Sequence, residues 1–383
     1  MSTTTTTTPQ WLVPLSETTL GEEEALVAAD VVRSGWLTQG ARVLAFEQAF
    51  AKFIGVPHAV AVANCTVGLE IAFDAVGVKP GDEVIVPSIT FVATANAARR
   101  LGATPVFADV LGPDDLTLDP ADVARRVTPR TRAIAPVHYA GWPADMGALR
   151  AIASEHGIAL VEDCAHAPGA RSPEGPCGTL GDIGAFSFFS NKNMATGEGG
   201  MLTTSRDDIA ARARLLRSHG MTSTTWDRHR GHAYTYDVAA VGTNARLDEI
   251  RAAIGIIQLA RLPGGNAVRA KCVERYRERL RDVPRLHIPF AGRDLADGAH
   301  HLFVVLLPPG TDRVAVMTSL REARVQTSIH YPPTHRFTAY AGLSHPLPVT
   351  DAIADRILTL PLYSTMTLSQ VDLVSDALRT ALG

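Results

Sequence analysis

One lysine of this chain, Lys192, follows an apolar run, residues 185–189, that predicts a buried strand, with Ser190 and Asn191 between them. Most lysines lie on the surface, so Lys192 is either a solvated loop residue or has a chemical role. Its neighbours favour a role. Ser187 and the pair at 190–191 can donate hydrogen bonds to an anion, and the GEGG turn at 197–200 lets backbone approach a ligand closely. A desolvated lysine amine with a lowered pKa is what Schiff-base chemistry requires.

A possible carboxylate partner lies upstream, in the segment IALVEDCAHAPGA. Its apolar strand ends in Glu162 and Asp163, and His166 follows. In open α/β sheets, ligands bind beyond the carboxyl ends of the strands. A carboxylate there, together with a lysine at the end of a later strand, suits pyridoxal 5′-phosphate (PLP). Lys192 would form the Schiff base, and Asp163 would keep the pyridine nitrogen protonated so that the ring accepts electrons.

Two segments, EDCAHAPGA (162–170) and GDIGAFSFFSNKNMATGEGG (181–200), resemble the DegT/StrS family of PLP-dependent sugar aminotransferases. This family has the aspartate-aminotransferase fold (fold type I), and the similarity extends from about residue 35 to residue 367. The resemblance implies Lys192 and Asp163 as catalytic residues, and pyridoxamine phosphate as the form that carries the amino group between half-reactions. It also implies glutamate as the expected amino-acid donor and a nucleotide-linked keto-sugar as the acceptor.

The resemblance assigns further cofactor contacts at the start of a predicted helix. The family's phosphate-binding glycine–threonine pair corresponds to Cys65 and Thr66, with cysteine in place of glycine. Free N–H groups at a helix N-terminus favour phosphate, although Thr66 could also be an ordinary helix cap. Ser187 would share the phosphate, and His166 is also assigned to the cofactor. Phe91, the aromatic of a P-S-x-T-aromatic segment, would stack on the PLP ring; a core aromatic is the alternative.

Asn244 lies in a segment that resembles the family's GxNxR motif, in which the asparagine reaches the partner subunit's PLP phosphate. Thr243 and Ala245 replace the usual aromatics. Asn244 could equally cap a long helix that we expect to begin near Arg246. The resemblance therefore implies a homodimer whose active sites are shared between chains.

Six residues are assigned to the substrate side: Trp36, Arg228, Arg230, His330, Tyr331 and His335. Trp36 belongs to a GW-x-T-x-G segment, and the last three to an HYxPxH segment, both typical of the family. The arginines of TWDRHRGH (225–232) could bind the diphosphate of a nucleotide-sugar, because a guanidinium forms a bidentate fork to phosphate oxygens. The alternatives are a helix-to-helix turn, a surface proline turn and a solvated basic loop.

We expect no metal site. The histidines of the irregular segment 219–238 (His219, His229 and His232) lack the spacing of known zinc motifs. The four cysteines are scattered without a CxxC pair, which indicates reduced thiols and favours a cytoplasmic protein. His138, at the end of another predicted strand, could be structural or functional and is left unassigned.

The overall composition is that of an ordinary globular chain. A formal net charge of −3 gives no reason to expect nucleic acid as a partner. No stretch approaches the roughly 18–20 apolar residues of a membrane span. The first ten residues, MSTTTTTTPQ, lack the features of a signal peptide and predict a disordered polar tail.

Strands and helices alternate from residue 59, which predicts an α/β fold with a mainly parallel, doubly wound sheet. The family fold implies seven strands. Helices are expected over 21–34, 206–218 and 313–322 and from about residue 246 to residue 262, and a strand over 301–308. The sequence Pro-Gly-Gly at 263–265 should break the chain. We therefore divide it into a large PLP-binding domain, residues 11–262, and a smaller C-terminal α/β domain, residues 263–383.

Other functions remain open at this point. The acceptor could be a keto-cyclitol or another ketone without a nucleotide, or the enzyme could perform elimination instead of amino transfer. Family members that dehydrate sugars have histidine in place of the lysine, so Lys192 disfavours dehydration. A PLP-binding protein without turnover would predict an eroded site, whereas Asp163, Ser187, Lys192 and GEGG are all present.

Overall fold

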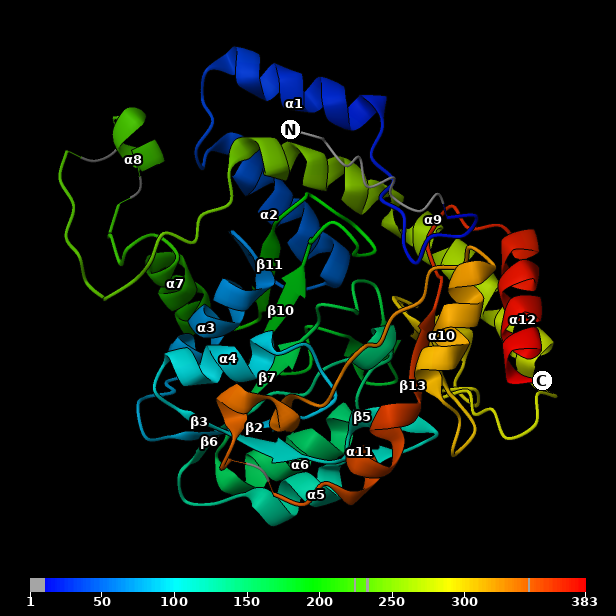
Figure 1. Cartoon of the computed structure of the whole chain (residues 1–383). Coiled ribbons are helices and arrows are strands. Elements are labelled where there is room, and N and C mark those ends of the chain that lie inside the picture. The colour runs from blue at the N-terminus through cyan, green and yellow to red at the C-terminus, as the bar shows by residue number, and fades with distance from the viewer. Residues whose placement is uncertain (1–10, 224, 232–233, 344) are drawn as a thin grey trace, which may run out of the picture.

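A seven-stranded sheet forms the centre of the computed structural model, which describes residues 11–223, 225–231, 234–343 and 345–383 (Figure 1). The tail predicted at residues 1–10 lies outside the described residues, as does His232. In sheet order, the strands are β1 (His58–Val62), β11 (Gly200–Thr204), β10 (Ile183–Ser187), β7 (Ala159–Asp163), β6 (Thr131–Ile134), β2 (Glu83–Pro87) and β3 (Thr104–Ala108). β11 is antiparallel to both of its neighbours, and the other pairs are parallel. The mainly parallel sheet is confirmed.

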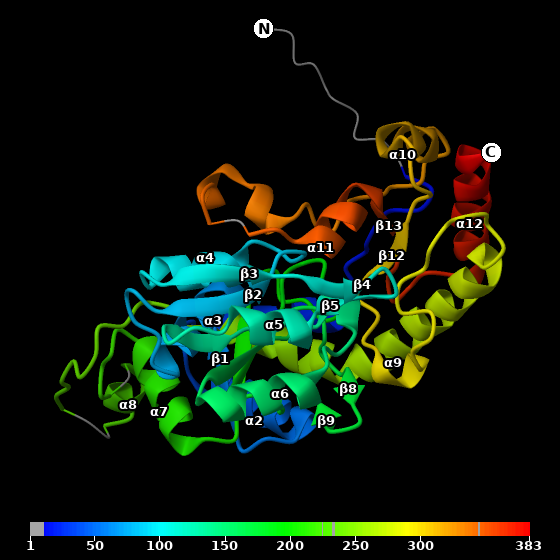
Figure 2. The same cartoon turned by 90° about the horizontal axis from the view of Figure 1, so that it is seen from below.

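Helices cover both faces of this sheet (Figure 2). Successive strand residues point to opposite faces, so Val60 and Val62 of β1 pack in one core and Ala59 and Ala61 in another. The first core lies under α3 (Cys65–Ala75), α4 (Ala93–Arg100) and α7 (Asp207–Leu216). The opposite face is covered by α2 (Ala41–Ile54), α5 (Pro120–Arg126) and α6 (Met146–His156).

The long helix α9 (Glu249–Leu280) lies beside α1 (Glu22–Ser34) and continues into the C-terminal part of the chain (Figure 1). The prediction that the helix ends before Pro263 is wrong, because α9 continues through that proline and the two glycines after it. These residues cost a helix roughly 3 kcal/mol for proline and about 1 kcal/mol for each glycine. Leu259 and Leu262 are buried in one core and Val273 in another, and this burial offsets the cost.

Asn244 does not cap α9. The N-cap is Asp248, whose carboxylate accepts a hydrogen bond from the Arg251 amide, so the capping alternative is wrong. Thr66 does not cap α3 either, since the Asn64 side chain accepts from the Val67 amide at 3.0 Å.

The C-terminal part contains a two-stranded antiparallel sheet, β12 (Phe303–Leu306) with β13 (Ile357–Leu360), together with α10 (Arg313–Glu322) and α12 (Leu368–Leu382). These elements share a core with the second half of α9 and with Val13. The amides of Leu12 and Val13 donate to the Arg324 carbonyl, so the start of the described chain packs on this C-terminal part. The division at residue 262 remains a prediction.

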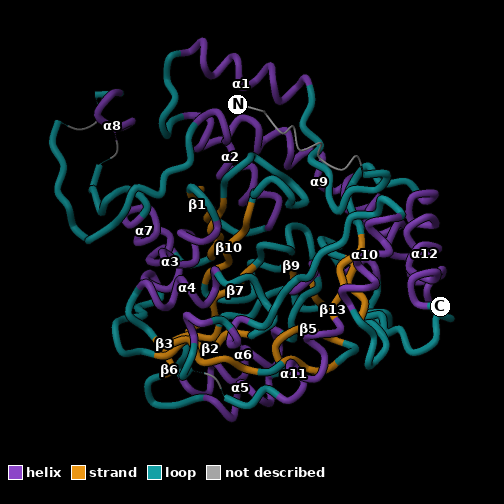
Figure 3. The backbone as a smooth tube through the Cα atoms, in the orientation of Figure 1, coloured by secondary structure: helices purple, strands orange, loops and turns teal. Residues whose placement is uncertain are grey.

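The remaining elements are small: β4 (Val110–Gly112), β5 (Asp115–Leu118), β8 (Arg171–Ser172), β9 (Gly175–Pro176), α8 (Thr225–His229) and α11 (Pro348–Ile353). Figure 3 shows α8 in a long loop that projects beyond α7. Among the described helices, none combines the length and apolar character needed to cross a bilayer.

Candidate active site

The predicted lysine and carboxylate lie at the same edge of the sheet. β7 ends at Asp163, which pairs in parallel with Ala185 of β10, so both strands end side by side. β10 ends at Ser187, two residues earlier than predicted, and a turn then leads to Lys192, whose amide donates to the Phe189 carbonyl at 2.9 Å. The sheet topology thus brings together two groups that are 29 positions apart in the sequence.

The last glycine of the turn after Lys192, Gly200, is required by a close approach within the chain, and the predicted approach of this turn to a ligand remains a prediction. A Cβ at Gly200 would lie only 2.8 Å from the Asn64 carbonyl carbon and 2.9 Å from the Cys65 amide nitrogen. Glycine is therefore needed because β11 starts directly against the N-terminus of α3. This close approach places the start of α3 beside the loop that carries Lys192.

Lys192 is partly buried among polar side chains. Its Nζ lies 3.4 Å from Nε2 of His301. Burial lowers the pKa of Lys192 to about 8, although the nearby Asp163 and Cys65 act in the opposite direction. A sizeable fraction of the amine is therefore uncharged in mildly alkaline solution, as Schiff-base formation requires.

Asp163 is buried and firmly oriented. The Thr94 hydroxyl donates to its Oδ2 at 2.7 Å, and the Ala165 amide donates to its Oδ1 at 3.1 Å. Burial raises the pKa of Asp163 although both hydrogen bonds favour the ionised form. A carboxyl group in this state is suited to share a proton with a buried basic nitrogen.

His166 lies near Lys192 and Tyr331 lies near Asp163, and Phe91 lies beside Tyr331. Nε2 of His166 lies 3.0 Å from the Tyr331 hydroxyl, and the Tyr331 ring lies 5.9 Å from the Phe91 ring. Burial and the charge of Lys192 hold the pKa of His166 well below its usual value. Phe91 is 56% exposed, so its interpretation as a core aromatic is wrong.

His330 also lies near the lysine. Its Nδ1 is 3.0 Å from the Thr359 hydroxyl, and its carbonyl accepts a hydrogen bond from the Tyr139 hydroxyl. Burial, and then the charge of Lys192, lowers the pKa of His330 to about 4. A cavity of about 20 Å³ lies beside this residue and His301. The structure therefore brings the predicted Tyr331 and His330 to the lysine from a segment beyond β12.

The proposed phosphate end of the site lies at the N-terminus of α3. Asn64 caps only the third helical amide, and the amides of Cys65 and Thr66 have no hydrogen-bond acceptor in the part of the chain that the structure describes. Oγ of Ser187 accepts from the Phe189 amide at 3.4 Å, which leaves its own proton available to an anion. These donors fit a phosphate.

Other predicted substrate residues lie apart from the lysine. Nδ1 of His335 is 2.7 Å from the Ser88 hydroxyl, and its Nε2 is 3.4 Å from Asp351. Those contacts attach the HYxPxH segment to the end of β2. His335 therefore has a structural set of partners, and its predicted contact with substrate remains a prediction.

Trp36 and the two arginines form a separate group around α8. The Trp36 ring lies 5.0 Å from that of Trp226 and 4.4 Å from that of His229. The guanidinium of Arg228 lies 4.8 Å from the centre of the Tyr236 ring, and that of Arg230 lies 5.9 Å from Trp226. Trp36 is therefore more than a helix-to-helix turn, because it anchors this projecting loop.

Asn244 is exposed on the strand-like segment that precedes α9. It forms a β-bridge with Ser218, and the next residue, Ala245, accepts a hydrogen bond from the Ala63 amide at 2.7 Å. This exposure leaves the Asn244 amide free to contact another molecule. Its contact with a partner's phosphate remains a prediction.

The sequence reasoning missed three contributors to the site: Thr94, Asn193 and His301. His301 lies 109 positions after Lys192 and beside a second histidine, so no local pattern distinguishes it. Asn193 could have been considered as the neighbour of Lys192. Thr94 carries no motif of its own.

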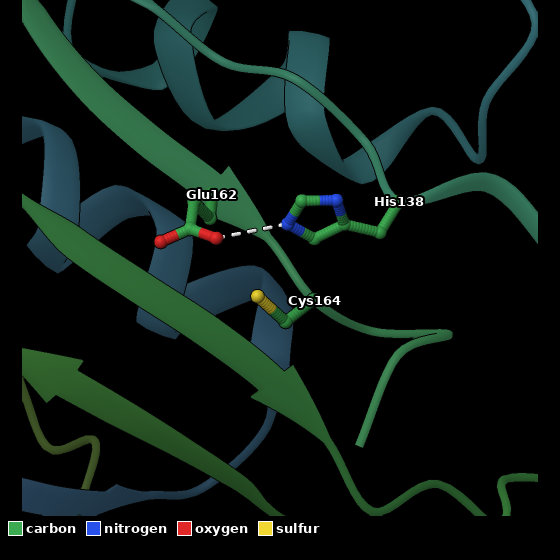
Figure 4. A group of neighbouring side chains, drawn as sticks. All are labelled: His138, Glu162 and Cys164. Carbon is green, nitrogen blue, oxygen red and sulfur yellow. Dashed lines mark hydrogen bonds and ion pairs between the residues drawn. The ribbon is translucent and has the colours of Figure 1, made fainter. Parts of the chain in front are cut away.

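A second buried polar cluster lies behind the site and consists of His138, Glu162 and Cys164 (Figure 4). Of the described residues, this is the one group whose ligand atoms are close enough for a metal ion. Nε2 of His138 donates to Glu162 at 2.9 Å, and its Nδ1 accepts from the Ala144 amide at 3.1 Å. Because both imidazole nitrogens are engaged, His138 has no lone pair for a metal. His138 is a structural hydrogen-bonding residue.

A profile of the DegT/DnrJ/EryC1/StrS aminotransferase family matches residues 18–379. The spore coat polysaccharide biosynthesis protein SpsC of Bacillus subtilis (strain 168) is 39% identical over 378 residues, which are 96% of each chain.

Two solved structures add information on ligands. DesI, determined in the presence of its TDP-sugar product, is 36% identical, with a TM-score of 0.87 over 98% of this chain and 94% of DesI. The putative sugar aminotransferase Spr1654 of Streptococcus pneumoniae is known in PMP and PLP forms. In the PMP form it is 27% identical, with a TM-score of 0.89 over 97% of this chain and 99% of that chain.

Proposed function

Because the chain belongs to the DegT/DnrJ/EryC1/StrS aminotransferase family, a family of PLP-dependent sugar aminotransferases, we propose that it transfers an amino group from glutamate to the ketone of a nucleotide-linked sugar. The observation that supports this most directly is the pairing at one sheet edge of Lys192, whose pKa is lowered, with the buried carboxyl of Asp163. A solvated loop lysine would show neither its partial burial nor its contact with His301.

The residues present fit PLP. Lys192 would hold it as a Schiff base, and Asp163 would pair with the pyridine nitrogen. Phe91 and His166 would contact the ring, with Nδ1 of His166 lacking a hydrogen-bond partner within the described ranges. When bound, PLP supplies an electron sink for the charge that develops at the α-carbon of the amino donor.

The phosphate of the cofactor would lie at the start of α3. Thr66 and Ser187 offer hydroxyl groups there, and the first two amides of the helix, including that of Cys65, offer N–H donors. The positive end of the helix dipole adds to the attraction for an anion. Asn244 of a second subunit would complete this set.

Lys192 performs two tasks in this proposal. Its uncharged amine would hold the cofactor covalently and would be released when an amino donor binds. The free amine then accepts a proton at Nζ from the α-carbon of the donor, and the reverse sequence delivers the amino group to the ketone. Asp163 would share a proton with the pyridine nitrogen, and the Thr94 hydroxyl and the Ala165 amide fix the orientation of its two carboxyl oxygens.

The nucleotide part of the acceptor is suggested by DesI, whose product is a TDP-sugar. We assign Trp36, Arg228 and Arg230 to the nucleotide diphosphate, since guanidinium groups bind phosphate oxygens in a bidentate manner. His330, Tyr331 and His335 are assigned to the sugar. His330 lies near Lys192, and Tyr331 lies near Asp163 and contacts His166, which supports this assignment for them.

A homodimer with shared sites is part of the proposal. Large apolar side chains are exposed just before Asn244, with Tyr234 97% and Val241 96% exposed, and Tyr236 and Val238 add to them. Such an exposed apolar segment is typical of a surface that binds another chain. The cytoplasm remains our expected location, supported by four unpaired cysteines, all buried.

The proposal is tested by loading the purified protein with PLP, reducing it with borohydride and mapping the modified peptide. The chain has four lysines, and we expect the cofactor on Lys192 alone. The protein loaded with pyridoxamine phosphate is then offered two classes of ketone, nucleotide-linked keto-sugars and phosphate-free keto-cyclitols. Return of the aldehyde form only with the nucleotide-linked class supports the proposal. Efficient reaction with the cyclitol alone would replace it.

A further inference from the structure

A chain of side-chain hydrogen bonds connects Lys192 with helix α9. Nζ of Lys192 lies 3.4 Å from Nε2 of His301, and Nδ1 of His301 lies 3.0 Å from Oδ1 of Asn193. Nδ2 of Asn193 in turn lies 2.8 Å from Oδ1 of Asn266, a residue of α9. His301 and Asn193 are both buried. The amine of Lys192 therefore ends a fixed polar network.

Two backbone carbonyls determine the direction of every bond in this network. Nδ2 of Asn193 is 2.6 Å from the Ala299 carbonyl, and Nδ2 of Asn266 is 3.0 Å from the Pro168 carbonyl. Because a carbonyl only accepts, each asparagine must direct its NH₂ group to it, and Oδ1 of Asn193 is left as an acceptor. His301 must then donate from Nδ1, so its lone pair is on Nε2 and faces the lysine.

His301 faces the lysine as an uncharged group. Burial, and then the charge of Lys192, holds the pKa of His301 well below its usual value. The other titratable or charged groups that act on the pair are His166, His330 and Arg269 near His301, and Asp163 and Cys65 near Lys192. Nε2 of His301 is therefore a neutral acceptor for an N–H of the lysine.

The direction of the hydrogen bond between Lys192 and His301 matters, because Lys192 must act as a nucleophile and a base. An amine that donates one N–H to His301 keeps its own lone pair free. The opposite tautomer of His301 would donate to the amine and occupy that lone pair. The chain of asparagines thus selects the tautomer that leaves Lys192 reactive.

We propose that His301 is a positioning residue for Lys192, which holds the amine by one N–H and leaves its lone pair directed at the reacting carbon. Asn193 and Asn266 maintain the necessary tautomer of His301. This inference rests on the proposed role of Lys192 in amino transfer. It assigns a task to three residues, of which His301 and Asn266 lie outside the motifs that suggested the function and Asn193 directly follows Lys192.

The test measures the pKa of Lys192 in the protein without cofactor, from the pH dependence of its acetylation by mass spectrometry. The other three lysines, Lys52, Lys79 and Lys271, are exposed and serve as internal references. The acceptor at Nε2 favours the charged ammonium, so its loss should lower the pKa of Lys192 below about 8. The acetylation rate at pH 7 should then rise by up to about tenfold.

Two variants of His301 carry the same amide group on side chains of different length. His301→Asn can still donate to Asn193 but is too short to meet Lys192, whereas His301→Gln can present an oxygen to it. We expect the pKa to fall in His301→Asn and to stay near the wild-type value in His301→Gln. The matched control is His300→Asn, since His300 bonds to the Leu295 carbonyl at 2.8 Å and does not contact Lys192.

Cooperative unfolding of each variant is verified first. If His301→Asn does not fold, His301→Leu takes its place with the same expectation. An unchanged pKa in the folded variant overturns the inference, and a raised pKa does so too, because it would mean that His301 is a cation. These measurements need no amino transfer. If the wild type transfers no amino group, the proposed function fails, whatever the labelling result.

Discussion

Glu162 and Asp163 are consecutive residues at the end of β7, but their carboxylates lie on opposite faces of the sheet in very different surroundings. Glu162 accepts hydrogen bonds from the amides of Gly178, Leu180 and Gly181 and from His138. From the described residues Asp163 accepts only two, and the charge of Lys192 acts on it.

The histidines near these two carboxylates differ in the same way. Both ring nitrogens of His138 are engaged, whereas Nδ1 of His166 has no partner among the residues that the structure describes. A fully satisfied buried cluster fixes a loop to a strand and has no capacity for a ligand. A buried cluster in which some polar atoms lack hydrogen-bond partners, and in which pKa values are shifted, is where a ligand or a reaction is expected. Five changes test whether the two carboxylates differ in this way.

The largest effect is expected for Lys192→Ala. Removal of the amine eliminates both the covalent link and the proton acceptor, so the rate of amino transfer should fall by at least about a thousandfold. The purified variant should still bind PLP, measured by its absorbance after gel filtration, but without a Schiff base. A loss of less than about tenfold would mean that another group performs these tasks.

The next largest effect on the rate is expected for Asp163→Asn. The amide cannot share a proton with the pyridine nitrogen, so the donor half-reaction should slow by about 10²- to 10³-fold in single-turnover measurements. Thr94→Val, which removes only one hydrogen bond to Asp163, serves as a milder control. Near-normal half-reaction rates in the asparagine variant would make Asp163 a structural carboxylate like its neighbour.

Glu162→Gln should disrupt the buried hydrogen-bonded cluster of His138, Glu162 and Cys164. A glutamine places an NH₂ group against backbone amides that need an acceptor, and each buried donor left without one costs about 1–3 kcal/mol. We expect the free energy of unfolding, measured in urea, to fall by about 2–4 kcal/mol, while the transfer rate of the folded variant stays within about threefold of wild type. A large loss of rate at unchanged stability would place Glu162 in the chemistry.

The pH dependence of stability should single out Lys192. Its pKa is about 8 when folded and near 10.5 when unfolded, so between these values only the unfolded chain retains the proton. Stability of the cofactor-free protein should therefore rise with pH across this window, and the full penalty is present below pH 8. Lys192→Met should be more stable than wild type by about 2 kcal/mol at pH 7, after allowance for partial exposure, and by about zero near pH 10.5. A difference that does not vary with pH would contradict the lowered pKa.

The smallest effect is expected from the double change Arg228→Ala and Arg230→Ala. Because Arg228 is half-buried and Arg230 is exposed, each contact with phosphate should contribute about 0.5–1 kcal/mol, so the KM for a nucleotide-sugar should rise by about five- to thirtyfold. The half-reaction with the amino donor should not change, and neither should reaction with a phosphate-free ketone. Equal losses with both acceptors would assign the α8 loop to structure and not to the diphosphate.

Several features could be predicted from the sequence because they depend on local pattern. Short continuous apolar runs predicted strands of the sheet, and the helix Arg313–Glu322 has the predicted bounds. Lys192 and Asp163 could be predicted as a pair because parallel strands end at one edge of a sheet.

Other features were decided only by the tertiary structure. Pro263 remains inside α9 because two hydrophobic cores bury the helix on either side of it, which outweighs a local penalty. Residues 12–13 pair with a segment more than 300 positions away. Phe91 is exposed although its type favours burial.

The polar network of the site is the clearest case. The sequence contains His138, His166, His300 and His301, but it does not indicate which of them has a ring nitrogen available as an acceptor in the site. That property depends on the partners of each ring, and for His301 these are Lys192 and Asn193, more than 100 positions earlier. The chemical types and the strands that carry them were determined locally. Which lone pair faces the lysine was decided by hydrogen bonds that exist only once distant segments have packed together.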